Sequence, residues 1–485
     1  MKKLPLNIGV IHFIGIGGIG MSGIAEALHH LGYQIQGSDV AKNANVIRLQ
    51  KLGIHIHIGH HAHNIHSPDS NPVAAVVRSS AVNESNVEVK AARKHQIPVI
   101  RRAEMLAELM RFKWSIAVGG THGKTTTTSL VGHILEQAHF DPTIINGGII
   151  NSYGSNTRLG KGDWMVVEAD ESDGTFTHLP AIAGIITNIE AEHMEHYGSF
   201  DKLQDAFKQF VSNIPFYGVV AVCTDDPEIE NLIPEFTRPL ITYGLKKPAD
   251  LQAINIKTDT NGLHFDLKIS HKINATDEIL NGFFLPMYGQ HNIANSLAAL
   301  AIGHKLDIPF KIMREALKNF EGIKRRFTQT GCINGITIID DYGHHPTEIN
   351  AVLKAARDII KSQGHGKVIA VMQPHRYSRL AHLFDDFCHC FSQASHIIIS
   401  EVFAAGETLI KGATQNDLIQ GIKKTGQNHV SALDSPENLA AEISQIAQEG
   451  DFVICLGAGS ITQWANALPD ELDKILNTPS KTSAL

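Results

Sequence analysis

Residues 114–137, WSIAVGGTHGKTTTTSLVGHILEQ, join an apolar run, a glycine-rich loop over 119–125 and a helix-like segment. This order predicts a buried strand, a tight loop and a helix, which is the arrangement of a phosphate loop. In such a loop, backbone N–H groups surround phosphates, Lys124 reaches the outer phosphates and Thr125 can hold Mg2+. Val118 stands where the general pattern has its first glycine, so this loop is one residue shorter. The stretch predicts a nucleoside triphosphate site.

Acidic residues follow the next strand-like run, where Glu168-Ala-Asp-Glu-Ser-Asp173 places four carboxylates within six residues. Carboxylates at a strand end beside a phosphate loop are natural Mg2+ ligands, although an acidic run is also typical of a solvated loop. Because 164–167 is typical of a buried strand, we expect Glu168 at the mouth of that strand. His193 follows the apolar run 184–187, and its chemistry alone favours a core or surface residue.

A second glycine loop lies near the N-terminus, where Gly15-Ile-Gly-Gly-Ile-Gly20 matches G-x-G-x-x-G between a predicted strand and a predicted helix. Asp39 ends the following strand, about 20 residues on, as in the dinucleotide-binding fingerprint. The plain interpretation of this motif is an NAD-dependent oxidoreductase. The loop demands only a diphosphate at a helix N-terminus, however, and a UDP-sugar meets that demand equally well.

The 485 residues divide into three sections in which strands alternate with helical stretches, and this alternation predicts an α/β protein with parallel sheets. We place the domains at 1–112, 113–325 and 326–485. The histidine-rich segment 55–66, HIHIGHHAHNIH, lacks neighbouring acids at metal-ligand spacing, so we expect a solvated loop there.

The composition limits the function. A net charge of −7 argues against a nucleic-acid-binding protein. The apolar run 181–186 is far shorter than the roughly 20 residues of a membrane span, which argues against membrane insertion. The five cysteines form no Cys-x-x-Cys pair and are typical of reduced thiols, which predicts a cytoplasmic protein.

Several motifs together resemble the Mur ligases, ATP-dependent enzymes that add amino acids to the peptidoglycan precursor. The loop 120–125 resembles the shortened phosphate loop of that family, and 187–194, TNIEAEHM, resembles its T-N-x-x-x-x-H segment. The resemblance implies one Mg2+ on Thr125 and a second Mg2+ on Glu168 and His193. It implies ATP contacts at Gly120, Thr121, His122, Gly123, Lys124, Thr125, Thr126, His291, Asn292, Asn295, Arg326 and Asp341.

Four stretches resemble the alanine-adding branch of the family in particular: 12–18, 168–173, 343–348 and 373–379. This branch implies UDP-N-acetylmuramate and L-alanine as substrates, which an acyl phosphate intermediate would join. The implied substrate contacts are Gly15, Gly17, Gly18, Gly20, Ser38, Asp39, Ser79, Ser80, Tyr342, His344, His375, Arg376 and Arg379. The implied catalytic residues are Lys124, Glu168, His193, His344, Arg376 and Arg379.

The resemblance implies a fold of three domains: a Rossmann-like UDP-binding domain, a central phosphate-loop ATPase domain with a parallel sheet and a C-terminal Rossmann-like domain. It leaves open whether Arg376 and Arg379 bind the muramyl carboxylate or the carboxylate of the amino acid. Several Mur ligases carry a carbamylated lysine after the histidine, but we expect Lys208 to be an exposed helical residue. We expect a monomer or a homodimer.

The sequence leaves three alternative functions open. An NAD-dependent oxidoreductase would leave the phosphate loop, Glu168 and His193 without a role. A Mur-type ligase that adds a preformed peptide would share the whole architecture. A non-catalytic nucleotide-binding regulator would retain Lys124 and Thr125 without turnover.

Overall fold

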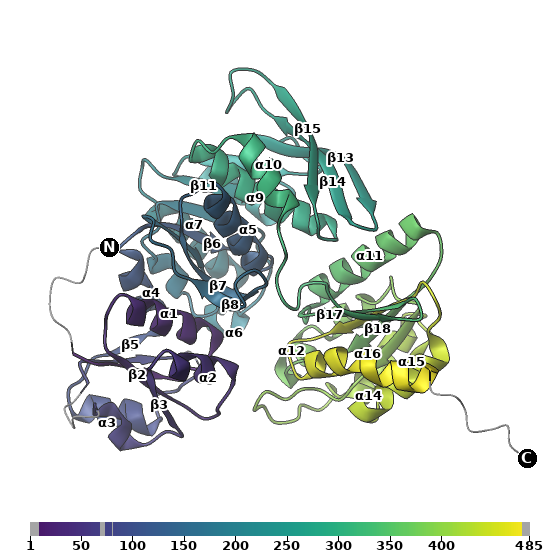
Figure 1. Cartoon of the computed structure of the whole chain (residues 1–485), viewed down its shortest axis with the longest axis horizontal. Coiled ribbons are helices and arrows are strands. Elements are labelled where there is room, and N and C mark those ends of the chain that lie inside the picture. Colours follow the sequence, from purple (N-terminus) through teal and green to yellow (C-terminus); the bar gives the residue numbers. More distant parts are fainter. Residues whose placement is uncertain (1–8, 68–72, 80, 478–485) are drawn as a thin grey trace, which may run out of the picture. The chain divides into compact units, whose positions relative to one another are not determined.

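The computed structural model describes residues 9–67, 73–79 and 81–477, and these form an α/β architecture with three sheets (Figure 1). The chain divides into two compact units. The first comprises 1–254, 265–283 and 293–321, and the second comprises 255–264, 284–292 and 322–485. Ser80, one of the expected substrate contacts, lies outside the described residues.

The N-terminal sheet has five parallel strands in the order β3-β2-β1-β4-β5. Strand β1 is buried at every position, as expected for a central parallel strand covered on both faces. The strands are β1 (Ile11–Ile14), β2 (Ile35–Asp39), β3 (His55–Ile58), β4 (Ala75–Arg78) and β5 (Val99–Arg101). The helices are α1 (Ile19–His30), α2 (Ala44–Lys51), η1 (Ala62–Ile65), α3 (Val87–Lys94) and α4 (Arg102–Met110).

The expected loop over 55–66 is wrong in its first four residues, because His55–Ile58 forms the edge strand β3 and pairs with β2 in register from Gln36↔His55 to Asp39↔Ile58. The sequence alternates His-Ile-His-Ile, and Ile56 is buried, while His55 is exposed. Alternation with a period of two is the signature of a half-buried strand.

The central sheet places three loops at one edge. Its ten strands have the order β15-β14-β13-β12-β11-β10-β6-β9-β7-β8, so β6 (Trp114–Gly119) lies between β10 (Ala183–Ile186) and β9 (Trp164–Glu168). Both pairings are parallel, with Val118 opposite Glu168 and Gly119 opposite Ile186. The segments that follow these three strands therefore leave the sheet at the same end, where ligands bind in open α/β sheets.

Helix α5 packs on strands β7 and β9 of this sheet. The remaining strands are β7 (Thr143–Ile150), β8 (Ser155–Arg158), β11 (Val219–Cys223), β12 (Leu240–Gly244), β13 (Leu251–Asp259), β14 (Gly262–Ile269) and β15 (Glu278–Leu285). The helices are α5 (Lys124–Gln137), η2 (Thr175–His178), α6 (Met194–Tyr197), α7 (Phe200–Asn213), α8 (Pro227–Leu232), η3 (Ile233–Glu235), α9 (Gln290–Lys305) and α10 (Phe310–Lys318).

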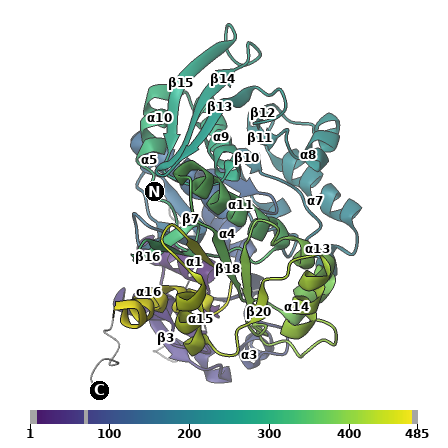
Figure 2. The ribbon, with the colours of Figure 1, turned by 90° about the vertical axis from the view of Figure 1, so that its right-hand side faces the viewer.

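The C-terminal sheet has six strands in the order β16-β17-β21-β18-β19-β20, and only the β16–β17 pair among them is antiparallel. Helices α11, α13 and α14 pack on one face, and α15 and α16 on the other (Figure 2). The strands are β16 (Thr328–Ile333), β17 (Ile336–Asp341), β18 (Val368–Met372), β19 (His396–Ile399), β20 (Val430–Ala432) and β21 (Phe452–Leu456). The helices are α11 (Pro346–Gln363), α12 (Tyr377–His382), α13 (Phe384–His389), α14 (Gln415–Lys424), η4 (Pro436–Asn438), α15 (Leu439–Ile446) and α16 (Ile461–Asn477).

Among the described residues, no helix has both the length and the apolar character needed to cross a membrane.

Candidate active site

The phosphate loop connects β6 to α5, and two of its glycines are required by geometry. Gly120 has φ +123° and Gly123 has φ +82°, in the left-handed region that favours glycine. A Cβ on Gly120 would collide with Oγ1 of Thr187, and a Cβ on Gly123 would lie 2.5 Å from Oδ1 of Asn295. The loop is therefore packed against the segment after β10 and against helix α9, and Asn295, one of the expected ATP contacts, lies beside Gly123.

Lys124 is folded back into the loop. Its Nζ donates to the carbonyl oxygens of Gly120 at 2.7 Å and Thr121 at 2.8 Å and to Oε1 of Glu171 at 2.9 Å. The Lys124 side chain is 14% exposed, and that of Glu171 is 2% exposed. Burial by itself would lower the pKa of Lys124, but the nearby carboxylates, led by Glu171, outweigh it and raise that pKa. Lys124 therefore stays charged throughout the physiological pH range.

Thr125 and Glu168, which the resemblance assigns to two different Mg2+ ions, are hydrogen-bonded to each other. Oγ1 of Thr125 donates to Oε2 of Glu168 at 2.9 Å, and the N–H of Gly147 donates to the same oxygen at 2.8 Å. A hydroxyl and a carboxylate are hard oxygen ligands of the kind that Mg2+ prefers. Thr126, the next expected nucleotide contact, is buried in the first turn of α5.

His193 lies close to Glu171 and Glu192. The resemblance implies instead that it shares a metal ion with Glu168. One ligand atom each of Glu171, Glu192 and His193 lie within 4.8 Å of one another. Nε2 of His193 is 4.0 Å from Glu171 and 3.8 Å from Glu192. Oε2 of Glu171 is buried and lies 2.9 Å from Nζ of Lys124. Two carboxylates and a histidine this close together fit a divalent cation.

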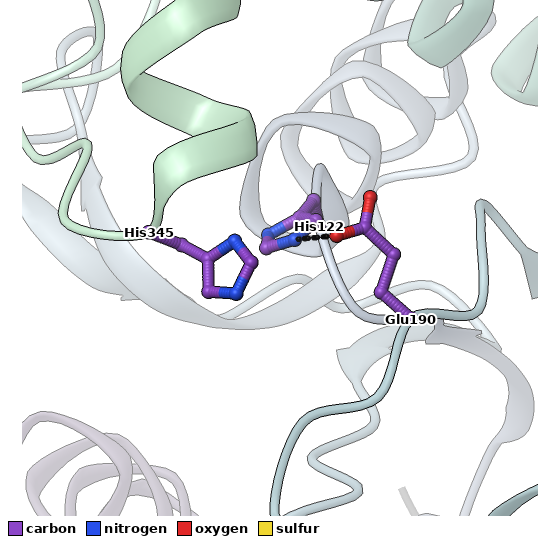
Figure 3. Close-up of side chains that lie close together, drawn as sticks. All are labelled: His122, Glu190 and His345. Atoms are coloured by element: carbon purple, nitrogen blue, oxygen red, sulfur yellow. Dashed lines mark hydrogen bonds and ion pairs between the residues drawn. The ribbon is translucent and has the colours of Figure 1, made fainter. Parts of the chain in front are cut away.

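His122 and Thr121 are fixed by the segment after β10. The N–H of His122 donates to Oδ1 of Asn188 at 2.7 Å, and its Nε2 lies 3.3 Å from Oε2 of Glu190 (Figure 3). Oγ1 of Thr121 accepts from the N–H of Glu190 at 2.8 Å. The T-N-x-x-x-x-H segment therefore holds the phosphate loop in shape as well as carrying His193.

In the N-terminal glycine loop, the acidic residue of the fingerprint turns inward. Oδ2 of Asp39 accepts from the N–H of Gly17 at 2.8 Å, while the carbonyl of Ser38 accepts from Gly15 at 2.8 Å and from Ile16 at 3.0 Å. Gly18 donates to Gly15 at 3.1 Å. The end of β2 therefore shapes the loop directly.

A buried glutamate ties the same region together. Glu88 accepts from Ser38 Oγ at 2.7 Å and from Asn64 Nδ2 at 2.6 Å, and it lies 3.0 Å from His12 Nε2. Burial raises the pKa of Glu88, but the bonds from His12, Ser38 and Asn64 outweigh it and lower the pKa to about 2. The hydroxyl of Ser38 is thus bound to Glu88, whereas Ser79 lies beside Gly15, whose Cβ position is 3.2 Å from Cβ of Ser79.

In the second unit, Asp341 joins the segment before β16 to the loop between β17 and α11. Its oxygens accept from the N–H groups of Phe327 and Gly343, both at 2.7 Å. Burial raises the pKa of Asp341 to about 6. The guanidinium groups of Arg325 and Arg326 lie 4.6 Å and 5.4 Å from the ring centre of Tyr342.

The segment after β18 carries the two expected carboxylate-binding arginines. Arg376 is exposed and has φ +69°, a strained value for a residue other than glycine. The ring of His375 stacks on Phe403 at 5.4 Å and lies 6.1 Å from that of His344, and its Nδ1 is 3.5 Å from Arg379. Burial, then His344 and the two arginines, lowers the pKa of His375 to about 4. The imidazole is therefore neutral at pH 7, and the two cations beside it disfavour its protonation.

The remaining expected residues are dispersed. His291 and Asn292 belong to the second unit, where Asn292 donates to the carbonyl of Tyr288 at 2.7 Å. Lys208 is helical, as expected, but only partly exposed, and its Nζ pairs with Asp205 at 2.7 Å and with Glu235 at 3.1 Å. The hydrogen bonds that Lys208 donates to these acids raise its pKa, which favours a charged amine over a carbamate.

Comparisons with known proteins cover nearly the whole chain. Residues 10–114 match a family model described as "Mur ligase family, catalytic domain". Residues 118–303 match "Mur ligase middle domain", and 325–459 match "Mur ligase, glutamate ligase domain". The chain belongs to the Mur ligase family.

Two relatives similar to this Mur ligase carry the same name. A protein of Rhodospirillum centenum, named UDP-N-acetylmuramate–L-alanine ligase, is 55% identical over 475 residues, which cover 98% of this chain and 97% of the relative. A protein of Gluconobacter oxydans with the same name is 53% identical over 485 residues, covering 100% of both.

Solved structures share the three-domain fold of this Mur ligase. The UDP-N-acetylmuramate-alanine ligase of Thermotoga maritima is 27% identical with a TM-score of 0.80, covering 97% of this chain and 100% of that one. A murein peptide ligase of Psychrobacter arcticus is 23% identical with a TM-score of 0.68, covering 98% and 100%, and it shows the fold alone. The expected α/β fold with a central phosphate-loop domain is confirmed.

Sequence reasoning missed several residues that hold this Mur ligase site. Glu171 stands in the acidic run, but nothing in the sequence distinguishes it from its neighbours as the partner of Lys124. Glu88 and Arg102 gave no signal, because their partners Ser38 and Asp170 lie 50 and 68 positions away. Asn188 stands in the T-N-x-x-x-x-H segment, but its bond to the N–H of His122 is a contact that only the structure shows.

Proposed function

We propose that this chain is an ATP-dependent ligase that joins L-alanine to the carboxylate of UDP-N-acetylmuramate, with ADP and phosphate as products, in peptidoglycan precursor synthesis. The observation that carries the proposal is the similarity along the whole chain to relatives of that name. The intact phosphate loop, with Lys124 buried and charged, supports a catalytic protein over a regulator. We further propose that the protein works in the cytoplasm.

In the proposed reaction, a carboxylate oxygen of the muramyl group attacks the γ-phosphorus of ATP, and ADP leaves. The alanine amine then attacks the acyl phosphate, phosphate leaves and an amide remains. Both steps concentrate negative charge, so catalysis rests on positioning and on fixed positive groups. Lys124, held within the loop, supplies such a charge at the outer phosphates.

Two groups of side chains fit Mg2+. Thr125 with Glu168 forms one, and His193 with Glu171 and Glu192 forms the other. Bound there, Mg2+ would offset repulsion between the phosphates and the substrate carboxylate. In addition, Glu171 keeps Lys124 in place and Gly147 orients Glu168.

We propose that the residues after β18 bind the carboxylate of a substrate. Arg376 and Arg379 are planar forks suited to bidentate carboxylate recognition. His375, with its pKa lowered to about 4, is neutral at pH 7, so it can accept a hydrogen bond from the attacking amine but is only a weak base. The ring of His344 lies next to that of His375 and would help to orient the same amine.

We further propose domain boundaries near residues 112 and 325.

The test is phosphate release with ATP, Mg2+ and UDP-N-acetylmuramate, scanned over single amino acids and a tripeptide acceptor. Release that depends on both the sugar nucleotide and L-alanine is expected. Dependence on the tripeptide would move the chain to the peptide-adding ligases, and no release by folded protein would leave a regulator.

Two lysine variants complete that test. Lys124→Met should lose activity by about 10²–10³-fold, as for removal of a preorganised charge. Lys208→Met, which removes an outward-facing lysine, should remain active. Loss of activity in the second variant would revive the carbamylated-lysine alternative.

A further inference from the structure

Arg102 contacts two parts of the first unit: the start of helix α1 and the acidic loop after β9. It opens helix α4, and its Nη2 lies 2.8 Å from Oδ2 of Asp170 in the acidic loop after β9. A Cβ built on Gly20 would lie 3.1 Å from both Cδ and Nη1 of Arg102. The arginine side chain therefore occupies the space that the last glycine of the G-x-G-x-x-G motif leaves open.

The N-terminus of α1 has features that favour binding of an anion. The N–H groups of a helix's first turn have no acceptor within the helix, and the helix dipole favours negative charge there. The first-turn residues of α1, all of them described, include no acid, whereas the guanidinium of Arg102 adds a positive charge next to Gly20. Gly17 and Gly18 donate within the loop, which leaves the turn beginning at Ile19 to face a ligand.

The other side of Arg102 faces the loop that serves the nucleotide. Asp170 precedes Glu171, the partner of Lys124, and follows Glu168, the partner of Thr125, by two positions. Arg102 is 15% exposed and Asp170 is 39% exposed, so both can meet a ligand. A guanidinium has five N–H donors in one plane and can bind two anions at once.

We propose that Arg102 binds the diphosphate of the UDP-sugar at the start of α1 and at the same time holds Asp170, so that one side chain joins the sugar-nucleotide site to the acidic loop. This inference rests on the proposed function, because it names a further binding residue for the same substrate. Nη1 and Nη2 would divide the two roles, since Nη2 is on Asp170 and Nη1 is beside Gly20.

The test compares Arg102→Met with Asp170→Asn in calorimetric titrations with UDP-N-acetylmuramate, without ATP or Mg2+. Arg102→Met should weaken binding by about 10–100-fold, the loss expected for one charge-assisted pair. Asp170→Asn frees Arg102 from its ion pair, so it should bind the sugar nucleotide as tightly as the wild type or more tightly. An arginine that only supports the fold would make the two variants weaken binding alike, and that result would overturn the inference.

ADP titration is the control for folding, because ADP binds at the phosphate loop. Both variants should bind ADP within about threefold of the wild type. If Arg102→Met fails to fold, Arg102→Lys takes its place, because lysine keeps the charge but lacks the planar fork. Weaker sugar-nucleotide binding with unchanged ADP binding supports the proposal. Unchanged binding of both ligands overturns it. Wild-type protein that binds ADP but no UDP-N-acetylmuramate would overturn the proposed function itself, whereas tight wild-type binding that Arg102→Met retains would overturn only the role of Arg102.

Discussion

The ammonium nitrogen of Lys124 lies 2.9 Å from both carboxylate oxygens of Glu171, within the loop that is proposed to bind ATP. Removing one partner of a buried ion pair leaves an uncompensated charge and costs about 3–5 kcal/mol, whereas removing both costs much less. Glu171 is therefore expected to matter for the stability of the loop as well as for its chemistry.

A double-mutant cycle measures this coupling. Lys124→Met and Glu171→Gln should each destabilise the central domain by about 3–5 kcal/mol, and the double variant by clearly less than their sum. Trp114 and Trp164 lie in this sheet with ring centres 5.6 Å apart, so their fluorescence during urea unfolding reports on it. Additive losses would mean that the two charges do not stabilise each other.

Arg376 is expected to separate stability from activity. Its φ of +69° costs about 1–3 kcal/mol in a residue other than glycine. Arg376→Gly should therefore unfold at an equal or higher temperature than the wild type, while the KM of one carboxylate substrate rises by about 10–100-fold. Arg379→Gly is the matched control, since a glycine inside helix α12 destabilises instead. A drop in the melting temperature of Arg376→Gly would contradict the strain argument.

Gly120 should tolerate no side chain. Gly120→Ala combines φ +123° with a collision against Thr187, so nucleotide binding should fall by more than about tenfold. Gly154→Ala is the control, because Gly154 also has a positive φ, +61°, but its Cβ would meet nothing within 4 Å. Titration with ADP compares the two variants, and equal affinities would show that space around Gly120 is not limiting.

Acid should weaken the N-terminal domain through Glu88. The pKa of Glu88 falls from 4.5 to about 2 on folding, so between these values the unfolded chain binds more protons. Its contribution, of the order of 3 kcal/mol, is full above about pH 5 and is lost as the pH falls toward 2.

Calorimetric unfolding of the wild type and Glu88→Gln checks this sign. The gap between their melting temperatures should be widest at pH 7 and should narrow below pH 5. Glu84→Gln, which removes an acid that is 53% exposed in the same domain, should leave the melting temperature nearly unchanged at every pH. A gap that widens in acid would contradict the lowered pKa.

The phosphate loop could be predicted because its signals are local. Glycines that require positive φ, a preceding apolar strand and a following helix stand next to one another along the chain, and each depends on its own backbone geometry. The same holds for the alternating strands and helices of all three sheets. The histidine-rich strand β3 was missed because the polar character of its side chains masked a period of two.

The sequence by itself therefore determined the α/β fold, the two glycine loops and the residue types that can hold phosphate. Only the tertiary structure decided the pairings among them: Lys124 with Glu171, Asp39 with Gly17, and Arg102 with Asp170. Four acids within six residues are equivalent in the sequence, and the direction in which the chain leaves β9 selects the one that meets Lys124. Partners tens of positions apart become neighbours only when parallel strands bring their carboxyl ends to one edge, because a hydrogen bond requires contact within about 3 Å.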